Sequence, residues 1–380
     1  MRGEEMSIKL KDVCKINMGQ SPESSSYNKN GKGIPFFQGN ADFGERYPVT
    51  RVWCNAPTKI AKNGDILISV RAPIGALNYA KEDCCIGRGL AAITPDTSKV
   101  SSEFIYWLLK GKHAELNNKG TGSTFKAIGR DVLEGILVPD ISLDKQHEYA
   151  VNLEKLYAIM GMKKQQLSAL DDLIKARFVE MFGDPVKNPK GWEKTVLSEN
   201  AEIKIGPFGS LLHKDDYITG GHALVNPSHI IAGQIVPDND LTISDEKYAE
   251  MSAYHLQKGD VVMGRRGEMG RCAVVEKSGL LCGTGSLIIR SKGELSADFI
   301  QKIISFPTFK KTIEDMAVGQ TMPNLNVPIV AAFQIIKPPK NVQNQYYDFI
   351  AQVDKTKANI QKSLEKSQLL FDSLMQEYFG

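Results

Sequence analysis

Residues 146–183 read QHEYAVNLEKLYAIMGMKKQQLSALDDLIKARFVEMFG, and a segment of the same length, residues 343–380, reads QNQYYDFIAQVDKTKANIQKSLEKSQLLFDSLMQEYFG. Both segments begin with Gln, end in Phe-Gly and contain no proline; apart from the terminal glycines, Gly161 is their only glycine. Their apolar residues recur at alternating steps of four and three, which is the a/d pattern of a helix that pairs with another helix. The sequence therefore predicts two long, paired helices.

The predicted seam of this helix pair consists of apolar side chains at the a and d positions. They are Leu153, Leu156, Leu167, Leu170 and Ile174 in the first segment, and Ile350, Val353, Ile360, Leu364, Phe371 and Leu374 in the second. Polar residues interrupt the pattern at Lys163, Arg177, Lys357 and Ser367. We interpret these as positions that set the register or reach solvent, at some cost in stability.

The repetition extends beyond the helices. Residues 63–71 (NGDILISVR) match residues 258–266 (KGDVVMGRR), and residues 122–125 (GSTF) match residues 319–322 (GQTM). The spacing between matched segments changes only slightly along the chain, as expected when insertions are confined to loops. Because repeats define architecture, the sequence predicts two copies of a globular unit that is followed by a helix.

The repeat places four boundaries along the chain. We expect a first globular unit at residues 1–141 with its helix at 142–183, and a second unit at 184–340 with its helix at 341–380. Short strand-like and helix-like segments alternate irregularly within each unit, which favours an α+β fold over a regular βαβ alternation.

Composition restricts the class of protein without identifying it. The chain has 380 residues, 42% hydrophobic and 24% charged, which is ordinary for a soluble globular protein. The net charge of +3 neither demands nor forbids an anionic partner, so a binding patch would have to be local. The six cysteines form no C-x-x-C pair, which is typical of reduced thiols in a cytoplasmic protein without a zinc site. We expect neither a signal peptide nor a membrane span.

A search for catalytic motifs returns mostly negatives. The sequence has no phosphate-binding P-loop, no dinucleotide-binding glycine motif and no H-E-x-x-H. It also lacks the [D/N/S]-P-P-[Y/F/W] tetrad of amino-methyltransferases, because Pro338-Pro339 stands between lysines. One nuclease-like pattern exists: Asp238 is followed by Asp245, Glu246 and Lys247. Two of these carboxylates with the lysine would suit metal-assisted phosphodiester cleavage, but this pattern has no counterpart in the first unit, so we interpret it as a solvated loop.

The remaining signal is one of binding. The candidate DNA-binding residues are arginines near glycines and small polar side chains of the Gly-x-Thr loops: Arg71, Arg88, Thr124, Lys126, Arg265, Arg266, Arg271, Gln320, Thr321, Asn324 and Asn326. Glycine lets the backbone approach a phosphate, arginine offers a forked donor to phosphate or guanine, and Asn or Gln reads adenine edges. The alternative is that the glycines serve tight turns and the arginines lie on a solvated face. Retention of these segments in both copies favours binding.

The whole chain resembles the specificity (S) subunit of type I restriction–modification systems. Its two helices end in residues 176–183 (ARFVEMFG) and 373–380 (SLMQEYFG), and they are entered through LDKQ at 143–146 and through Pro338, Pro339 and Gln345. The first lead-in has a single proline, Pro139, where the family usually has two, which leaves the geometry of that linker open.

The resemblance implies a DNA-recognition role without catalysis. Each globular unit would be a target-recognition domain that reads one half of a bipartite site in double-stranded DNA, and the antiparallel helices would dock two methyltransferase subunits. S-adenosylmethionine, ATP and Mg²⁺ are expected on those subunits and on separate restriction subunits, with no cofactor on this chain. A helix of this length spans about 57 Å, enough to separate half-sites about one DNA turn, roughly 34–36 Å, apart. Because the two units differ in sequence, the half-sites should differ.

Two other classes of function remain open at this point. One is an enzyme, either a standalone nuclease or an unrecognised methyltransferase, which Mg²⁺-dependent cleavage of DNA or binding of a methyl donor would reveal. The other is a coiled-coil scaffold that binds only protein, against which salt-dependent binding to duplex DNA would argue.

Overall fold

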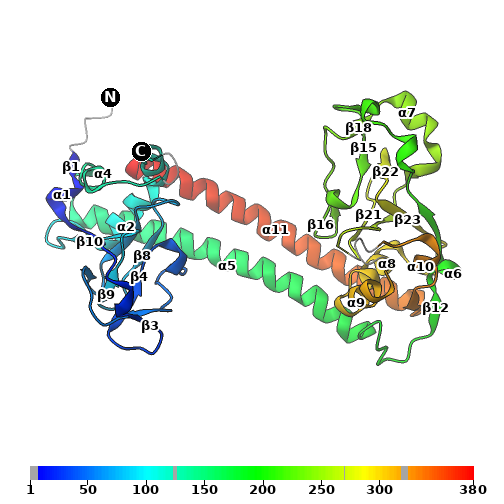
Figure 1. The fold of residues 1–380 in the computed structure, drawn as a ribbon, viewed down its shortest axis with the longest axis horizontal. Coiled ribbons are helices and arrows are strands. Elements are labelled where there is room, and N and C mark those ends of the chain that lie inside the picture. Colours follow the sequence, from blue (N-terminus) through cyan, green and yellow to red (C-terminus); the bar gives the residue numbers. More distant parts are fainter. Residues whose placement is uncertain (1–6, 123–125, 269, 318–323) are drawn as a thin grey trace. The chain divides into compact units, whose positions relative to one another are not determined.

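The computed structural model describes residues 7–122, 126–268, 270–317 and 324–380. The chain forms two compact units, Met1–Leu167 with Asn359–Gly380 and Ser168–Ala358. The division crosses both long helices, so each strand-rich part remains with the helix ends that pack against it (Figure 1).

In the first unit, an antiparallel sheet and a mixed sheet share one globular part. The antiparallel sheet has the order β2-β10-β7-β8, the mixed sheet the order β3-β5-β4-β9-β6, and β1 pairs with β11. The elements in chain order are β1 (Ser7–Lys9), α1 (Leu10–Val13), β2 (Cys14–Met18), β3 (Tyr27–Asn28), β4 (Ile34–Phe37), β5 (Trp53–Cys54), β6 (Ile60–Ala61), β7 (Ile66–Ser69), β8 (Leu77–Tyr79), β9 (Cys84–Ile86), β10 (Leu90–Pro95), α2 (Ser102–Gly111), α3 (His113–Lys119), α4 (Arg130–Glu134), β11 (Leu137–Pro139) and α5 (Leu143–Phe182).

The second unit repeats this topology. Its antiparallel sheet has the order β13-β23-β20-β21, its mixed sheet the order β14-β18-β15-β22-β19, and β12 pairs with β24. The elements are β12 (Lys194–Val196), α6 (Leu197–Asn200), β13 (Ala201–Ile205), β14 (Tyr217–Ile218), β15 (His222–Val225), β16 (Ile230–Ile231), β17 (Gln234–Ile235), β18 (Thr242–Ile243), α7 (Asp245–Glu250), β19 (His255–Leu256), β20 (Asp260–Gly264), β21 (Cys272–Val274), β22 (Leu280–Cys282), β23 (Ser286–Ser291), α8 (Ala297–Ile304), α9 (Pro307–Met316), α10 (Val327–Ala331), β24 (Gln334–Ile336) and α11 (Lys340–Phe379).

This topology confirms the α+β repeat that the sequence predicts. The central strands β7 and β20 carry the matched apolar runs, and every residue in both is buried. A continuous apolar run suits a strand that is covered on both faces. The parallel pairs β4–β9 and β15–β22 occupy the same place in their sheets. Short 3-10 turns connect several strands, including η2 (Asn40–Asp42).

The long helices pair within each unit. In the first unit, the beginning of α5 packs against the end of α11, with the rings of Tyr149 and Tyr378 stacked at 3.6 Å between centroids. In the second, the end of α5 packs against the beginning of α11, where the hydroxyl of Tyr346 donates to the carbonyl of Ile174 at 3.4 Å. The pairing is therefore antiparallel. All eleven predicted seam residues are buried or half-buried.

Three of the four polar residues that interrupt the seam form bonds between the helices, whereas Arg177 pairs with Glu180 of its own helix. The ammonium of Lys163 donates to the carbonyl of Ser363 at 3.0 Å and to the hydroxyl of Ser367 at 2.7 Å. Lys357 pairs with Asp171 across the helices at 2.6 Å. Bonds with such fixed partners specify one register, which agrees with the register-setting interpretation.

A buried glutamine joins the start of each long helix to its globular part. The side-chain oxygen of Gln146 accepts from the backbone N–H of Ser101 at 2.8 Å, and its amide donates to the carbonyl of Ile141 at 3.0 Å. Gln343 makes the matching bonds to the N–H of Ser296 and the carbonyl of Pro338. The sequence marks both glutamines as the first residues of the repeat, and Gln146 also as the end of the LDKQ entry; the structure shows which groups they bind.

Candidate nucleic-acid interface

Three segments that are distant in sequence meet at the end of each central hairpin. In the first unit, the N–H of Val70 donates to the carbonyl of Gly89 at 2.9 Å, and the N–H of Ile128 donates to the carbonyl of Val70 at 2.9 Å. In the second unit, the N–H of Arg265 donates to the carbonyl of Gly285 at 3.0 Å, and that of Leu325 to the carbonyl of Arg265 at 3.0 Å. The same backbone scaffold therefore presents the predicted residues in both units.

In the first unit this scaffold forms a cavity of about 310 Å³. Its lining includes Arg71 on the turn after β7 and Arg88 between β9 and β10, both of them exposed. Lys126 is tied to the same place, because its carbonyl accepts from the N–H of Ala72 at 3.0 Å. The structure thus brings Arg71 and Arg88 together and places the backbone of Lys126 beside the hairpin turn, whereas Thr124 lies outside the described residues.

Two amide side chains complete this cavity, and sequence inspection did not single them out. Gln38, Gly39 and Asn40 also line the cavity. Gly89 permits the close approach, because a Cβ at that position would lie 2.3 Å from the carbonyl oxygen of Gln38. A side chain there would have to displace backbone, so the glycine is required by packing. A signal was available, since Gln-Gly-Asn directly follows the apolar, aromatic run of β4.

The cavity is cationic. Its lining contains two arginines and no carboxylate. Arg71 makes no side-chain hydrogen bond or ion pair with any described residue, and the one such bond of Arg88 is a long contact of 3.5 Å to the hydroxyl of Ser21. The neighbouring carboxylate of Asp42 accepts from the N–H of Gln38 at 2.8 Å. Unpaired guanidinium groups around a hollow suit an anionic ligand.

In the second unit the equivalent arginines have more internal partners. The guanidinium of Arg265 donates from Nε to the side-chain oxygen of Asn324 at 3.1 Å, while burial, followed by the charge of Arg266, lowers the pKa of Arg265. Arg266 is exposed and forms a backbone bridge with Asn324. Arg266 therefore remains accessible to a ligand, with Arg265 as the residue that positions the adjoining loop.

Two predicted binding residues of this unit are engaged in local structure. Arg271 pairs with Glu268, which also contacts Lys310 at 3.2 Å, and these hydrogen bonds lower the pKa of Glu268. The side chain of Asn326 caps α10 by accepting from the N–H of Ile329 at 3.0 Å. Gln320 and Thr321 lie outside the described residues.

The nuclease-like pattern lies elsewhere in the second unit. Asp245, Glu246 and Lys247 form the first turn of α7, so they are not in a loop as the sequence suggested. Asp245 pairs with His222 at 3.0 Å, and Asp238 accepts from the N–H of Asp240 at 3.0 Å. Each carboxylate thus has a local partner. Within the described ranges, no group of three or more His, Cys, Asp or Glu side chains is arranged to hold a metal ion.

Among the residues that the structure places, no helix combines the length and hydrophobicity needed to cross a bilayer.

Comparison with known families gives one match over most of the chain. The family described as "Type I restriction modification DNA specificity domain" matches residues 3–171 and again residues 189–367. The two matches correspond to the two halves of the repeat.

Individual relatives agree with this family. The putative type I restriction enzyme MjaX specificity subunit of Methanocaldococcus jannaschii is 42% identical over 157 residues, which cover 41% of this chain and 37% of that protein. The matched segment thus spans little more than a third of that relative. The type I restriction enzyme MjaIX specificity subunit of the same organism is 24% identical over 97% of this chain and 90% of its own length.

A solved structure shares the fold. The crystal structure of the type I restriction–modification S subunit from M. genitalium is 15% identical, covers 99% of this chain and 96% of its own, and has a TM-score of 0.59. At this identity the likeness concerns the fold alone.

Proposed function

This chain belongs to the family of type I restriction–modification DNA specificity domains, of which it carries two, and we propose that it directs a methyltransferase complex to an asymmetric, bipartite DNA site. Residues 1–141 and 184–340 are the two recognition domains in this proposal, and the paired helices join them. The observation that carries the proposal is the repeated junction of hairpin turn, glycine segment and loop, which presents Arg71 and Arg88 in one domain and Arg266 in the other.

The physics of the two domains supports different half-sites. Backbone scaffolds that match will dock on duplex DNA in the same way, because phosphate contacts set position and carry no sequence information. Side chains on the scaffolds differ, however, with free arginines around a cavity in the first domain and a bonded Arg265–Asn324 pair in the second. Since base contacts specify the sequence, the two halves of the site should not be palindromic.

The partners follow from the family and form part of the same proposal. Two methyltransferase subunits would dock along the paired helices and carry S-adenosylmethionine, and restriction subunits would carry ATP and Mg²⁺ in the cytoplasm. The family assignment of DNA specificity fits a chain that supplies recognition and leaves the chemistry to its partners.

A domain exchange tests the proposal. The chain is co-expressed with the methyltransferase subunit of its own locus, and the methylated motif is mapped by sequencing. Replacing residues 184–340 with the same domain of another family member should change one half of the motif and leave the other, and replacing residues 1–141 should do the reverse. A change in both halves, or in neither, would mean that the repeat does not divide the DNA.

The purified chain separates the alternatives. Incubation with Mg²⁺ and duplex DNA should give no cleavage, whereas cleavage that Asp238→Ala abolishes would support a nuclease. Binding should weaken steeply with salt, as counterion release requires. The absence of any salt-dependent DNA binding by the complex would favour a protein-binding scaffold.

A further inference from the structure

We propose that the first domain reads an adenine in its half-site through the amides of Gln38 and Asn40, with Arg71 and Arg88 holding the flanking phosphates. This inference rests on the proposed function and names the groups that would give the first domain its sequence preference. The four side chains share the cavity of about 310 Å³ at the end of the central hairpin.

The backbone that carries the amides is fixed on every side. The carbonyl of Gln38 accepts from the N–H of Gly89 at 3.1 Å, and its N–H donates to the carboxylate of Asp42 at 2.8 Å. The carbonyl of Asn40 accepts from the N–H of Phe43 at 3.0 Å, which closes the 3-10 turn η2. A rigid backbone lowers the entropy that a reading side chain loses on binding.

The amide groups themselves are free. Neither the side chain of Gln38 nor that of Asn40 hydrogen-bonds to a described residue, although most backbone groups of the same short segment are hydrogen-bonded. An amide offers a donor beside an acceptor, which matches N7 and N6 on the major-groove edge of adenine. Covering these amides with any surface that left them unpaired would cost free energy, so a cavity of this kind favours a ligand with both functions.

The two arginines are charged and exposed, and they suit phosphates better than base edges. Arg71 and Arg88 come from two different loops, both are exposed, and the cavity lining offers them no carboxylate. Arg51 adds a third exposed cation near η2, where its guanidinium donates to the carbonyl of Ala41 at 3.3 Å. Cations on several sides of one hollow suit the phosphates that flank a base, because such contacts position the duplex.

The second domain lacks this arrangement. The N–H of Gly283 donates to the carbonyl of Val225, as that of Gly87 does to Phe37, so Asn226 holds the place of Gln38. The Asn226 side chain packs against Gly283, where a Cβ would lie 2.1 Å from its oxygen. Pro227 follows, and its carbonyl accepts from Arg271 at 3.1 Å. The pair of free amides, Gln38 and Asn40, is therefore a feature of the first domain.

Substitutions in the co-expressed methyltransferase complex test this inference. Gln38→Ala and Asn40→Ala should each relax the methylated motif at an adenine in the first domain's half-site and reduce discrimination there about 5- to 150-fold. Gln38→Glu keeps the shape but removes the donor, and it should lose the adenine preference while the melting temperature is retained. A duplex with 7-deazaadenine at that position should bind wild type more weakly than the unmodified duplex does. The Gln38→Ala variant should bind the two duplexes equally well.

Arginine variants provide the contrast. Arg71→Ala and Arg88→Ala should weaken binding to all sequences and lower the slope of log K against log salt by about one, without altering the motif. Asn30→Ala is the matched control, because Asn30 is an exposed amide that precedes β4 whereas Gln38 follows it. It should leave the motif and the salt slope unchanged.

The outcomes distinguish failure of the adenine-reading role from failure of the proposed function. If wild type methylates a defined bipartite motif and Gln38→Ala and Asn40→Ala keep every position of it, the adenine-reading role is wrong and the proposed function stands. If the complex methylates no defined motif, the proposed function itself fails. Relaxation in the other half-site would also overturn the inference.

Discussion

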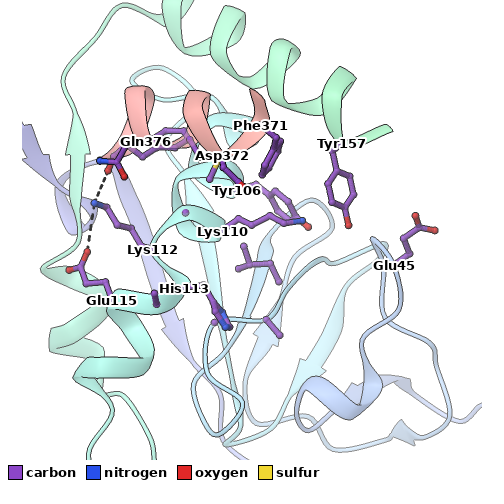
Figure 2. Close-up of a pocket in the computed structure, with 18 residues that line it drawn as sticks. Glu45, Tyr106, Lys110, Lys112, His113, Glu115, Tyr157, Phe371, Asp372 and Gln376 are labelled. Atoms are coloured by element: carbon purple, nitrogen blue, oxygen red, sulfur yellow. Dashed lines mark hydrogen bonds and ion pairs between the residues drawn. The ribbon is translucent and has the colours of Figure 1, made fainter. Parts of the chain in front are cut away.

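The two recognition domains differ at one matched position where they meet their helices. In the first unit, Trp107 of α2 contacts the rings of Tyr157 and Phe371 at 5.5 and 5.7 Å between centroids (Figure 2 shows the latter two beside α2). In the second unit, Lys302 of α8 holds the place of Trp107, counted from the N-caps Ser101 and Ser296. Both junctions contain aromatic rings, since Phe299 of α8 lies 4.9 Å from Phe182 of α5 between centroids. We use the name aromatic junction for the surroundings of Trp107 and charged junction for the surroundings of Lys302.

Cations also serve different purposes at the two junctions. In the aromatic junction, Arg46 lies over the ring of Tyr106 at 4.4 Å and pairs with Glu154 at 2.6 Å, so the loop that carries Arg46 is clamped to α5. In the charged junction, Lys302 shares a cavity of about 610 Å³ with Asp171, Asp354 and Lys357, among other residues. Dispersion and cation–π contacts depend little on salt, whereas accessible ion pairs do, so the two domains should respond differently to their surroundings.

The largest expected effect is the loss of the aromatic anchor. Trp107→Ala removes a fully buried side chain and should lower the free energy of unfolding by about 3–5 kcal/mol. Lys302→Ala, the matched change in the second unit, should cost about 1 kcal/mol or less. Urea unfolding followed by circular dichroism measures both. Equal losses for the two variants would contradict the distinction between the junctions.

The helix seam should be sensitive in both units. Leu364→Asp and Leu170→Asp each place a carboxylate against one of the two apolar cores. Each change should cost several kcal/mol, because a buried charge without a partner is strongly unfavourable. Thermal melting and co-purification with the methyltransferase subunit are the readouts. Wild-type melting for both variants would show that the seam does not hold the helices together.

A pH series sharpens the description of the aromatic junction. The Nζ atom of Lys110 lies 3.8 Å from the centroid of Tyr157, and burial, followed by the charge of Arg46, lowers the pKa of Lys110 to about 8 (Figure 2). Between this value and the unfolded pKa, near 10.4, the unfolded chain binds more protons, so this group adds stability as the pH rises.

The matched variant Lys110→Met keeps the length of the side chain and cannot titrate. The unfolding free energy of the variant minus that of wild type should therefore fall as the pH rises from about 8 to about 10.5, because only wild type gains stability from this group over that range. Parallel curves across that range would contradict the lowered pKa of Lys110. Using the difference removes the contribution of the tyrosines and cysteines, which titrate in both proteins.

The smallest expected effect concerns the charged junction. Asp171→Asn removes the partner of Lys357 and should cost 1 kcal/mol or less at low salt, because both side chains are partly exposed. The cost should fall further at about 1 M salt, where screening acts over about 3 Å. Urea unfolding at two salt concentrations measures this change. A large loss of unfolding free energy that does not depend on salt would show that the charged junction, like the aromatic junction, is held by contacts other than accessible ion pairs.

The helices and the repeat were predictable because their signals are local. A seven-residue pattern such as Leu153–Leu156–Met160 can be read along the chain, and matched glycine segments mark the strands around it. The cavity was harder to predict, because Gln38, Arg71 and Arg88 come together through pairings between distant strands. Propensity and periodicity say little about which strands pair.

The same limit explains why some candidate binding residues turn out to have internal partners. Arg71 and Arg271 both lie in the turn of a central hairpin near glycine. Arg271 is nevertheless paired with Glu268, whereas Arg71 has no side-chain partner among the described residues. Asn326 looks like a base-reading amide in sequence, but the first turn of α10 takes up its oxygen. Whether a polar side chain is free depends on its neighbours in space, which composition and spacing do not reveal.

The glutamine joints have a consequence for how such a protein changes over generations. Gln146 holds the N–H of Ser101 and the carbonyl of Ile141, and Gln343 holds the same kinds of groups in the other half. Every partner is a backbone atom, so the joint places little demand on which side chains the attached domain carries. Recombination can then exchange the attached domain while this joint is kept, although side-chain contacts at the junction, such as Arg46 with Glu154, must also be met. Because the joint binds backbone atoms alone, it suits different domains, and a new DNA specificity can arise in one genetic step.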